Sequence, residues 1–116
     1  MAYKFEKLNV WHKALAFTDI IYSISDGFPK EEQYGLITQI RRASNSIVLN
    51  ISEGATGNSD PDFKRFLMMA SRSCAEVVSC LYLGQRRGWI TQTTFTNAYN
   101  ASEDLYKMIS KLKSSL

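Results

Sequence analysis

Apolar side chains recur at spacings of three and four residues along most of this chain, and this period most constrains its fold. In residues 10–26 the repeating set is Val10, Ala14, Phe17, Ile21 and Ile24. Such a stripe covers one face of an α-helix, whereas a strand would alternate apolar and polar side chains. The pattern predicts a helix over residues 10–26, ended by Gly27 and followed by Pro29.

The same period recurs in three later segments and predicts helices over about residues 32–55, 61–87 and 92–114. Asp60 is the expected N-cap of the third of these four helices, with Pro61 at its first position. Short links force neighbouring helices to run antiparallel. The sequence therefore predicts an all-α fold, an antiparallel up-down-up-down four-helix bundle, as a single domain over residues 1–116.

Composition narrows the class of protein. Fourteen aromatic residues among 116 argue against a disordered chain. The formal net charge of +3 permits an anionic partner, and the excess lies in residues 58–88 and 89–116. The longest purely apolar run has five residues, and no signal peptide opens the chain, so we expect a cytoplasmic protein that does not span a membrane.

The residues that usually carry chemistry are sparse. Cys74 and Cys80 lie six positions apart in one predicted helix, about 9 Å along its axis, which favours two reduced thiols over a disulfide. His12 is the single histidine, and Asn9 stands where a di-iron bundle would need a glutamate. We expect no metal, no cofactor and no enzymatic activity.

The outer side of the third predicted helix carries a row of arginines. Arg65, Arg72 and Arg86 fall within about 60° of one another, opposite the core stripe, and Arg87 follows at the end of the helix. Apolar or sulfur-containing side chains share this outer half: Met68, Met69, Cys80 and Leu83. One interpretation is a solvated face with an Arg72–Glu76 ion pair. The other is a contact surface for nucleic acid or another partner.

The outer side of the second predicted helix carries a second line of side chains. Its members are Arg42, Ser46, Leu49 and Glu53, with Asn50 at the edge. Arg42 and Glu53 lie about 16 Å apart along the axis, too far to pair with each other. The line is either solvated, or it contacts a neighbouring helix or another subunit.

Several of these residues belong to a pattern that resembles a known family. The pattern runs from Gly27 to Leu36, continues with Gln39-Ile40-Arg41-Arg42-Ala43, and includes Asn50-Ile51-Ser52-Glu53-Gly54. It is similar to the bacterial four-helix-bundle proteins encoded in intervening sequences of 23S rRNA genes. Trp11-x-Lys13-Ala14, Phe63-x-x-Phe66-Leu67 and Ser73-x-x-Glu76 fit the same pattern.

The resemblance implies a four-helix bundle that assembles as a homopentamer. Related proteins include accessory factors of diversity-generating retroelements, which work with a reverse transcriptase and nucleic acid. The expected subunit interface combines Arg42, Ser46, Leu49, Asn50, Glu53, Met68, Met69 and Leu83. The expected nucleic-acid or partner contacts are Arg65, Arg72, Arg86 and Arg87.

Two functions remain open at this point. The first is a homo-oligomeric accessory factor that binds nucleic acid or a nucleic-acid enzyme such as a reverse transcriptase. The second is a protein–protein interaction module or scaffold with no nucleic-acid role. For an enzyme, the sequence offers no convergent set of titratable groups.

Overall fold

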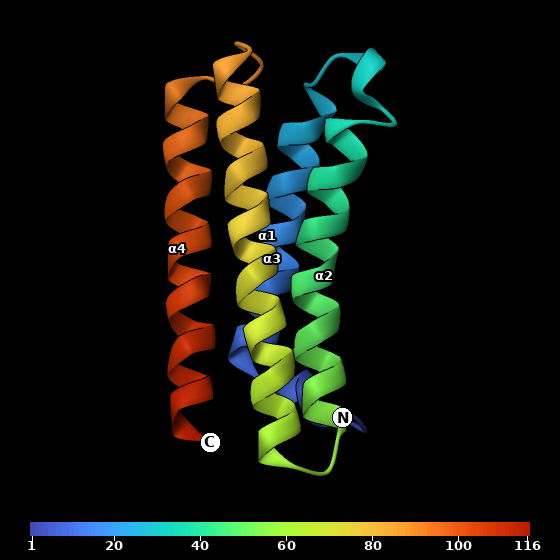
Figure 1. Ribbon diagram of the computed structural model, residues 1–116, viewed down its shortest axis with the longest axis vertical. Coiled ribbons are helices and arrows are strands. Elements are labelled where there is room, and N and C mark those ends of the chain that lie inside the picture. Colours follow the sequence, from blue (N-terminus) through green and yellow to red (C-terminus); the bar gives the residue numbers. More distant parts are fainter.

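Four long helices account for most of the chain in the computed structural model, which describes residues 1–116. They are α1 (Asn9–Asp26), α2 (Leu36–Thr56), α3 (Asp60–Arg86) and α4 (Gln92–Ser115), with short 3-10 helices η1 (Lys4–Lys7) and η2 (Lys30–Glu32) before α1 and α2. Consecutive long helices run in opposite directions, and both termini lie at one end (Figure 1). The predicted all-α, up-down-up-down four-helix bundle is confirmed.

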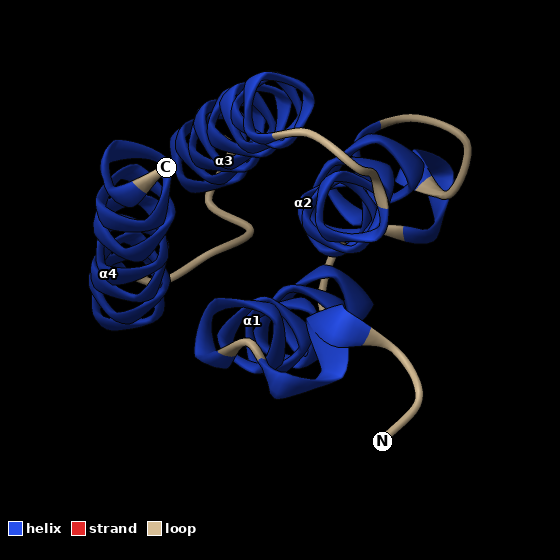
Figure 2. Ribbon diagram, turned by 90° about the horizontal axis from the view of Figure 1, so that it is seen from below, coloured by secondary structure: helices blue, strands red, loops and turns tan.

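The helices surround a common core in chain order (Figure 2). Contacts join α1 to α2, α2 to α3, α3 to α4 and α4 to α1, and none joins either diagonal pair. The most extensive contact is between α2 and α3. The bundle measures 44 × 23 × 23 Å.

One apolar cluster of 24 buried residues fills the centre. Its fully buried large side chains come from all four helices and include Ile21, Ile47, Leu67 and Leu105. Burying a side chain of this size contributes about 1.5–3 kcal/mol. α2 buries a wider face than its predicted stripe, because it packs on both α1 and α3: Ala43, Val48, Asn50, Gly54 and Ala55 are buried as well.

The start of α2 differs from the prediction. The helix begins at Leu36 rather than near residue 32, because Gly35 has a non-helical backbone with φ −115° and ψ −113°. The preceding acidic residues form η2 instead. Glu32 still serves the helix from outside, since its carboxylate Oε1 accepts a hydrogen bond from the Leu36 backbone N–H at 3.1 Å. An anion beside a helix N-terminus is favourable.

The ends of α3 and α4 are set mainly by local side-chain chemistry. The N-cap of α3 is Ser59 and not Asp60: the Ser59 hydroxyl accepts from the Asp62 N–H at 3.2 Å. The N-cap of α4 is Thr91, whose hydroxyl accepts from the Thr94 N–H at 3.2 Å. Gly88 follows α3 with φ 78°, a conformation that glycine adopts without a Cβ penalty.

By length and composition alone, α3 could cross a membrane. Its most apolar 18-residue window has a mean hydropathy of 1.3, and 39% of that window is buried within the bundle. A core helix of a bundle meets the same two criteria, so the finding is weak evidence for a span. The absence of a membrane partner stays a prediction.

Candidate functional site

The two adjacent arginines of α2 have different roles. Arg41 donates from Nε to the Ser25 hydroxyl at 2.8 Å and from Nη2 to Asp26 Oδ1 at 2.7 Å. Its guanidinium also lies 4.6 Å from the centre of the Tyr22 ring. Arg41 therefore ties α2 to α1, a role that the sequence analysis missed. Arg42 is exposed and forms no ion pair within the chain.

Ser46 and Asn50 face α3 instead of the outside of the bundle. The Ser73 hydroxyl of α3 donates to the Ser46 hydroxyl at 3.0 Å. The Asn50 amide donates to the Ser46 carbonyl and hydroxyl, both at 2.9 Å. Asn50 is only 9% exposed, so its placement on the outer line was wrong. Ser46 joins neighbouring helices, one of the two alternatives that the sequence left open.

The rest of the outer line of α2 is exposed. Leu49 is 59% exposed, and Arg42 and Glu53 are exposed and unpaired. A polar cleft of about 570 Å³ lies beside Arg42, and Glu76 of α3 lines it from the opposite side without forming an ion pair. The predicted Arg72–Glu76 ion pair is not formed either.

The arginines of α3 differ in their partners and are spread along the helix. Arg65 is engaged locally, because its Nη2 lies 2.9 Å from Asp62 Oδ1 and its guanidinium 4.6 Å from the centre of the Phe66 ring. Arg86 and Arg87 are exposed at the far end of the helix, about 21 Å from Arg72 along the axis. Arg72 is exposed without an ion-pair partner.

The sulfur-containing and apolar residues predicted beside these arginines also differ in exposure. Met68 and Leu83 are 40% and 44% exposed, and Met69 is half-buried. Cys80 is only 1% exposed, so its predicted place on the outer half of the helix was wrong. Burial raises the pKa of Cys74 to about 12, and burial together with the nearby Glu76 carboxylate raises the pKa of Cys80 to about 11. Both thiols are free and lie in the core.

A groove between the first half of α3 and the last turns of α4 gathers cations from both helices. Its volume is about 510 Å³, within the usual range for small-ligand sites. Three basic side chains line it, Lys64 and Arg72 from α3 and Lys113 from α4. No carboxylate lines this groove, and none of the three cations forms an ion pair.

Three serine hydroxyls in this groove have no hydrogen-bond partner within the chain. Ser71, Ser110 and Ser114 line it, and none of them forms a side-chain hydrogen bond within the chain. By contrast, Ser52 and Ser115 donate to the carbonyl three residues earlier in their own helices. The groove therefore offers free hydroxyl donors beside free cations, which is the combination that binds phosphate oxygens.

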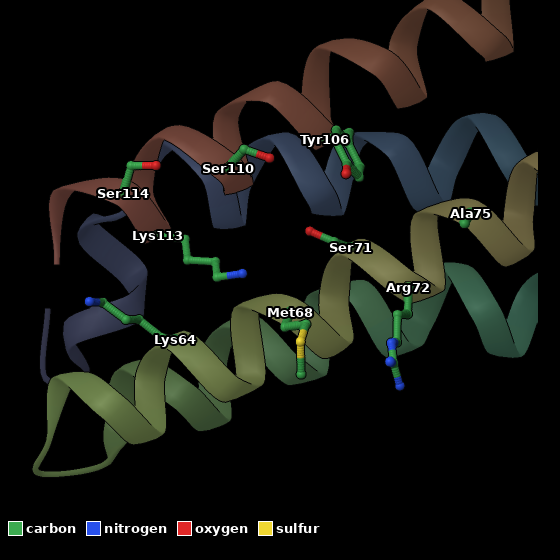
Figure 3. A pocket seen from close by; sticks show the side chains of 9 residues that line it. All are labelled: Lys64, Met68, Ser71, Arg72, Ala75, Tyr106, Ser110, Lys113 and Ser114. Atoms are coloured by element: carbon green, nitrogen blue, oxygen red, sulfur yellow. The ribbon is translucent and has the colours of Figure 1, made fainter.

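The side chains of the groove differ in orientation (Figure 3). Lys113 extends from α4 into the gap between the helices, and Ser71 points back from α3 toward α4 (Figure 3). Lys113 is half-buried, so its charge is partly removed from water without a carboxylate to balance it. Arg72 and Met68 extend from the other edge of α3 and form the rim. Of the predicted partner-contact arginines, only Arg72 belongs to this groove.

The groove could not be read from one helix alone. Lys64 and Lys113 stand 49 positions apart, and only the antiparallel pairing of α3 and α4 brings them to the same hollow. In the sequence, Lys113 fits a simpler role as a cation near a helix C-terminus. No three His, Cys, Asp or Glu side chains lie close enough together to hold a metal ion.

Comparison with known proteins identifies the family. The family model of the 23S rRNA-intervening sequence protein matches residues 6–111, almost the whole chain. This chain belongs to the 23S rRNA-intervening sequence protein family. No curated protein matches the chain.

A solved structure agrees with this assignment. A protein of unknown function from the S23 ribosomal protein family of Bacteroides thetaiotaomicron is 26% identical, with a TM-score of 0.82. The match covers 90% of this chain and 97% of that one. The resemblance stated from the motifs is thereby confirmed.

Proposed function

We propose that this protein is a non-enzymatic accessory factor that binds nucleic acid through the α3–α4 groove and assembles as a homo-oligomer, with five subunits as the expected number. The observation that carries the proposal is the half-buried, unpaired Lys113 in a groove with two further cations and no carboxylate. An anion in the groove would balance this charge and form charge-assisted hydrogen bonds with it.

Several features support phosphate as that anion. Lysine and arginine side chains combined with hydroxyl donors form the usual contacts to phosphate oxygens. The chain as a whole is positive, with a net charge of +3, and a ring of subunits would multiply this field. A reverse-transcriptase-like protein carrying nucleic acid fits the same proposal as a partner.

The test is binding of a fluorescent single-stranded RNA and DNA across a salt series starting at 50 mM. If the three cations contact phosphates, the logarithm of the affinity should fall with the logarithm of salt concentration with a slope of about −2 per protomer. Absence of salt-dependent binding at the lowest salt would refute the nucleic-acid role.

Charge reversal locates the site. Lys113→Glu places a carboxylate in the groove and should weaken binding by about tenfold or more, as for loss of a charged hydrogen bond. Lys111→Glu is the matched control, because Lys111 lies two positions away and lines a different hollow between α1 and α4. Equal losses in the two variants would show that net charge, and not this groove, governs binding.

Self-association is proposed through the outer face of α2. Leu49 is more than half exposed there, and Arg42 and Glu53 have no partner within the chain. Arg42→Glu should shift the mass in sedimentation velocity toward the monomer. An unchanged assembly with unchanged stability would contradict this part of the proposal.

The second candidate is a protein–protein interaction module with no nucleic-acid role. It is favoured by large apolar and aromatic side chains that are exposed to solvent, above all Tyr34, which is 91% exposed. This candidate predicts capture of a defined partner and indifference to RNA in the salt series. The two functions are thus separated by the same binding assay.

A further inference from the structure

We propose that the α3–α4 groove is specific for single-stranded nucleic acid, with a phosphate at Lys64 and Lys113 and an unpaired base stacked on the ring of Tyr106. This inference rests on the proposed function, because it names the form of nucleic acid that the same site would take. The evidence is the placement and isolation of the Tyr106 ring.

Tyr106 is an aromatic side chain with no partner inside the protein. It is 48% exposed, and its ring pairs with no other aromatic ring, no cation and no hydrogen-bond partner. Two other exposed tyrosines are engaged: the Tyr82 ring lies 4.8 Å from that of Phe95, and the Tyr22 hydroxyl accepts from Asn45 at 2.8 Å. Tyr34 is free as well, but it lines the cleft that also holds the Glu76 carboxylate. Tyr106 differs from Tyr34 in lining a groove that holds three cations and no carboxylate.

The Tyr106 ring stands between two hollows of different chemistry. On one side is the cationic groove, and on the other a smaller hollow of about 280 Å³ lined mainly by apolar and aromatic side chains, including Val78 and Tyr99. Tyr106 and Ala75 line both hollows. One ligand can thus place an anionic group in the cationic groove and a flat apolar group against the Tyr106 ring.

Register along α4 places the two contacts on one face. Tyr106 and Lys113 are seven positions apart, about two turns and about 10 Å along the axis. Lys113 extends into the gap between the helices, and the ring of Tyr106 faces the same gap (Figure 3). A phosphate bound at Lys113 and a base on Tyr106 can therefore belong to one strand.

Base stacking distinguishes single strands from duplexes. In a duplex the faces of the bases are covered by their neighbours, so a protein ring can stack only on an unstacked base. Stacking of one base on an aromatic side chain raises affinity by roughly tenfold. The cations alone would bind either form, so Tyr106 is the residue that would select between them.

The experiment compares three RNA probes of one length by fluorescence anisotropy at 50 mM salt: a mixed-sequence single strand, the same strand with abasic positions, and a duplex. The unmodified protein should bind the single strand about tenfold more tightly than the abasic strand. Tyr106→Leu keeps apolar bulk but removes the ring, and should lose this advantage while leaving duplex and abasic binding unchanged. Tyr106→Phe keeps the ring and should bind as the original protein does.

Each outcome has a separate meaning. Equal binding of all three probes, unaffected by Tyr106→Leu, overturns the stacking inference and leaves the proposed function standing. If none of the three probes binds, both the stacking inference and the proposed nucleic-acid role are refuted. If Tyr106→Leu changes the sedimentation mass and not the affinity for RNA, the ring is a subunit contact and the inference is wrong. Equal urea midpoints for Tyr106→Leu and Tyr106→Phe would show that a difference in RNA binding between them does not come from a loss of stability.

Discussion

Gly54 of α2 packs directly against α3, and replacing it with alanine should destabilise the bundle. An added Cβ would lie 2.7 Å from the Cβ of Phe66 and 2.8 Å from Cδ1 of Phe63. Favourable carbon contacts are about 3.5–4.0 Å, so the new atom is about 1 Å too close. The Phe66 Cβ is fixed to the α3 backbone, and the two helices must therefore move apart.

The magnitude follows from two opposing effects. Overpacking of a well-packed core costs about 1–3 kcal/mol, and a contact with an immovable atom belongs at the upper end. Alanine gains about 1 kcal/mol over glycine in a helix interior. Gly54→Ala should therefore lower the free energy of unfolding by about 2 kcal/mol, which is about 1 M in the urea midpoint for a slope of about 2 kcal/mol/M.

The assay is urea unfolding followed by circular dichroism at one protein concentration, because self-association would make stability concentration-dependent. Gly27→Ala is the control, since its nearest contact, the Ile24 carbonyl, would lie at an ordinary 3.4 Å. It should change stability by less than about 0.5 kcal/mol. A Gly54→Ala protein as stable as the original, or more stable, would refute the close approach of α2 and α3.

Three further predictions concern the core and the helix contacts. Stability should fall as pH rises above 9, because the unfolded chain releases the protons of Cys74 and Cys80 near pH 9.0 while the folded chain holds them to about 12 and about 11. Each thiol contributes a slope of up to about 1.4 kcal/mol per pH unit, so Cys74→Ala should remove about half of the thiol-dependent slope in urea titrations at pH 8 to 10.5. Ser46→Ala should cost more than Ser73→Ala, because Ser46 loses bonds to both Ser73 and Asn50, and a double-mutant cycle should give about 0.5–1.5 kcal/mol of coupling. Arg41→Lys should lower the free energy of unfolding by about 1–2 kcal/mol and lower the melting temperature, whereas Arg42→Lys should leave the melting temperature unchanged.

The fold was predictable because its signals are local. Helical stripes depend on residues three and four positions apart, and the structure confirms the four helices that they predict. The errors at helix starts have local causes too. Ser59 and Asp60 are both good N-cap residues, and the sequence alone does not show which of them accepts the capping hydrogen bond. Gly35 breaks a helix that the acidic residues before it would otherwise favour.

The candidate site was less predictable because it depends on pairing between helices. A helical wheel treats each helix alone, so it placed Asn50 and Cys80 outside although neighbouring helices cover them. It also does not show which arginines of α3 have partners, such as Arg65 with Asp62. The groove needed Lys113 of α4 beside α3, and no pattern within one segment carries that information.

The ring-like order of the helices has a consequence for how the protein assembles itself. Contacts are made chiefly between helices that follow each other in the chain, and only the α1–α4 contact spans its whole length. Chains dominated by such local contacts fold rapidly. The cationic groove is formed by α3 and α4, which are joined by the short link of residues 87–91. The groove therefore lies within one helical hairpin, whereas closing the bundle requires the contact of α4 with α1 at the opposite end of the sequence.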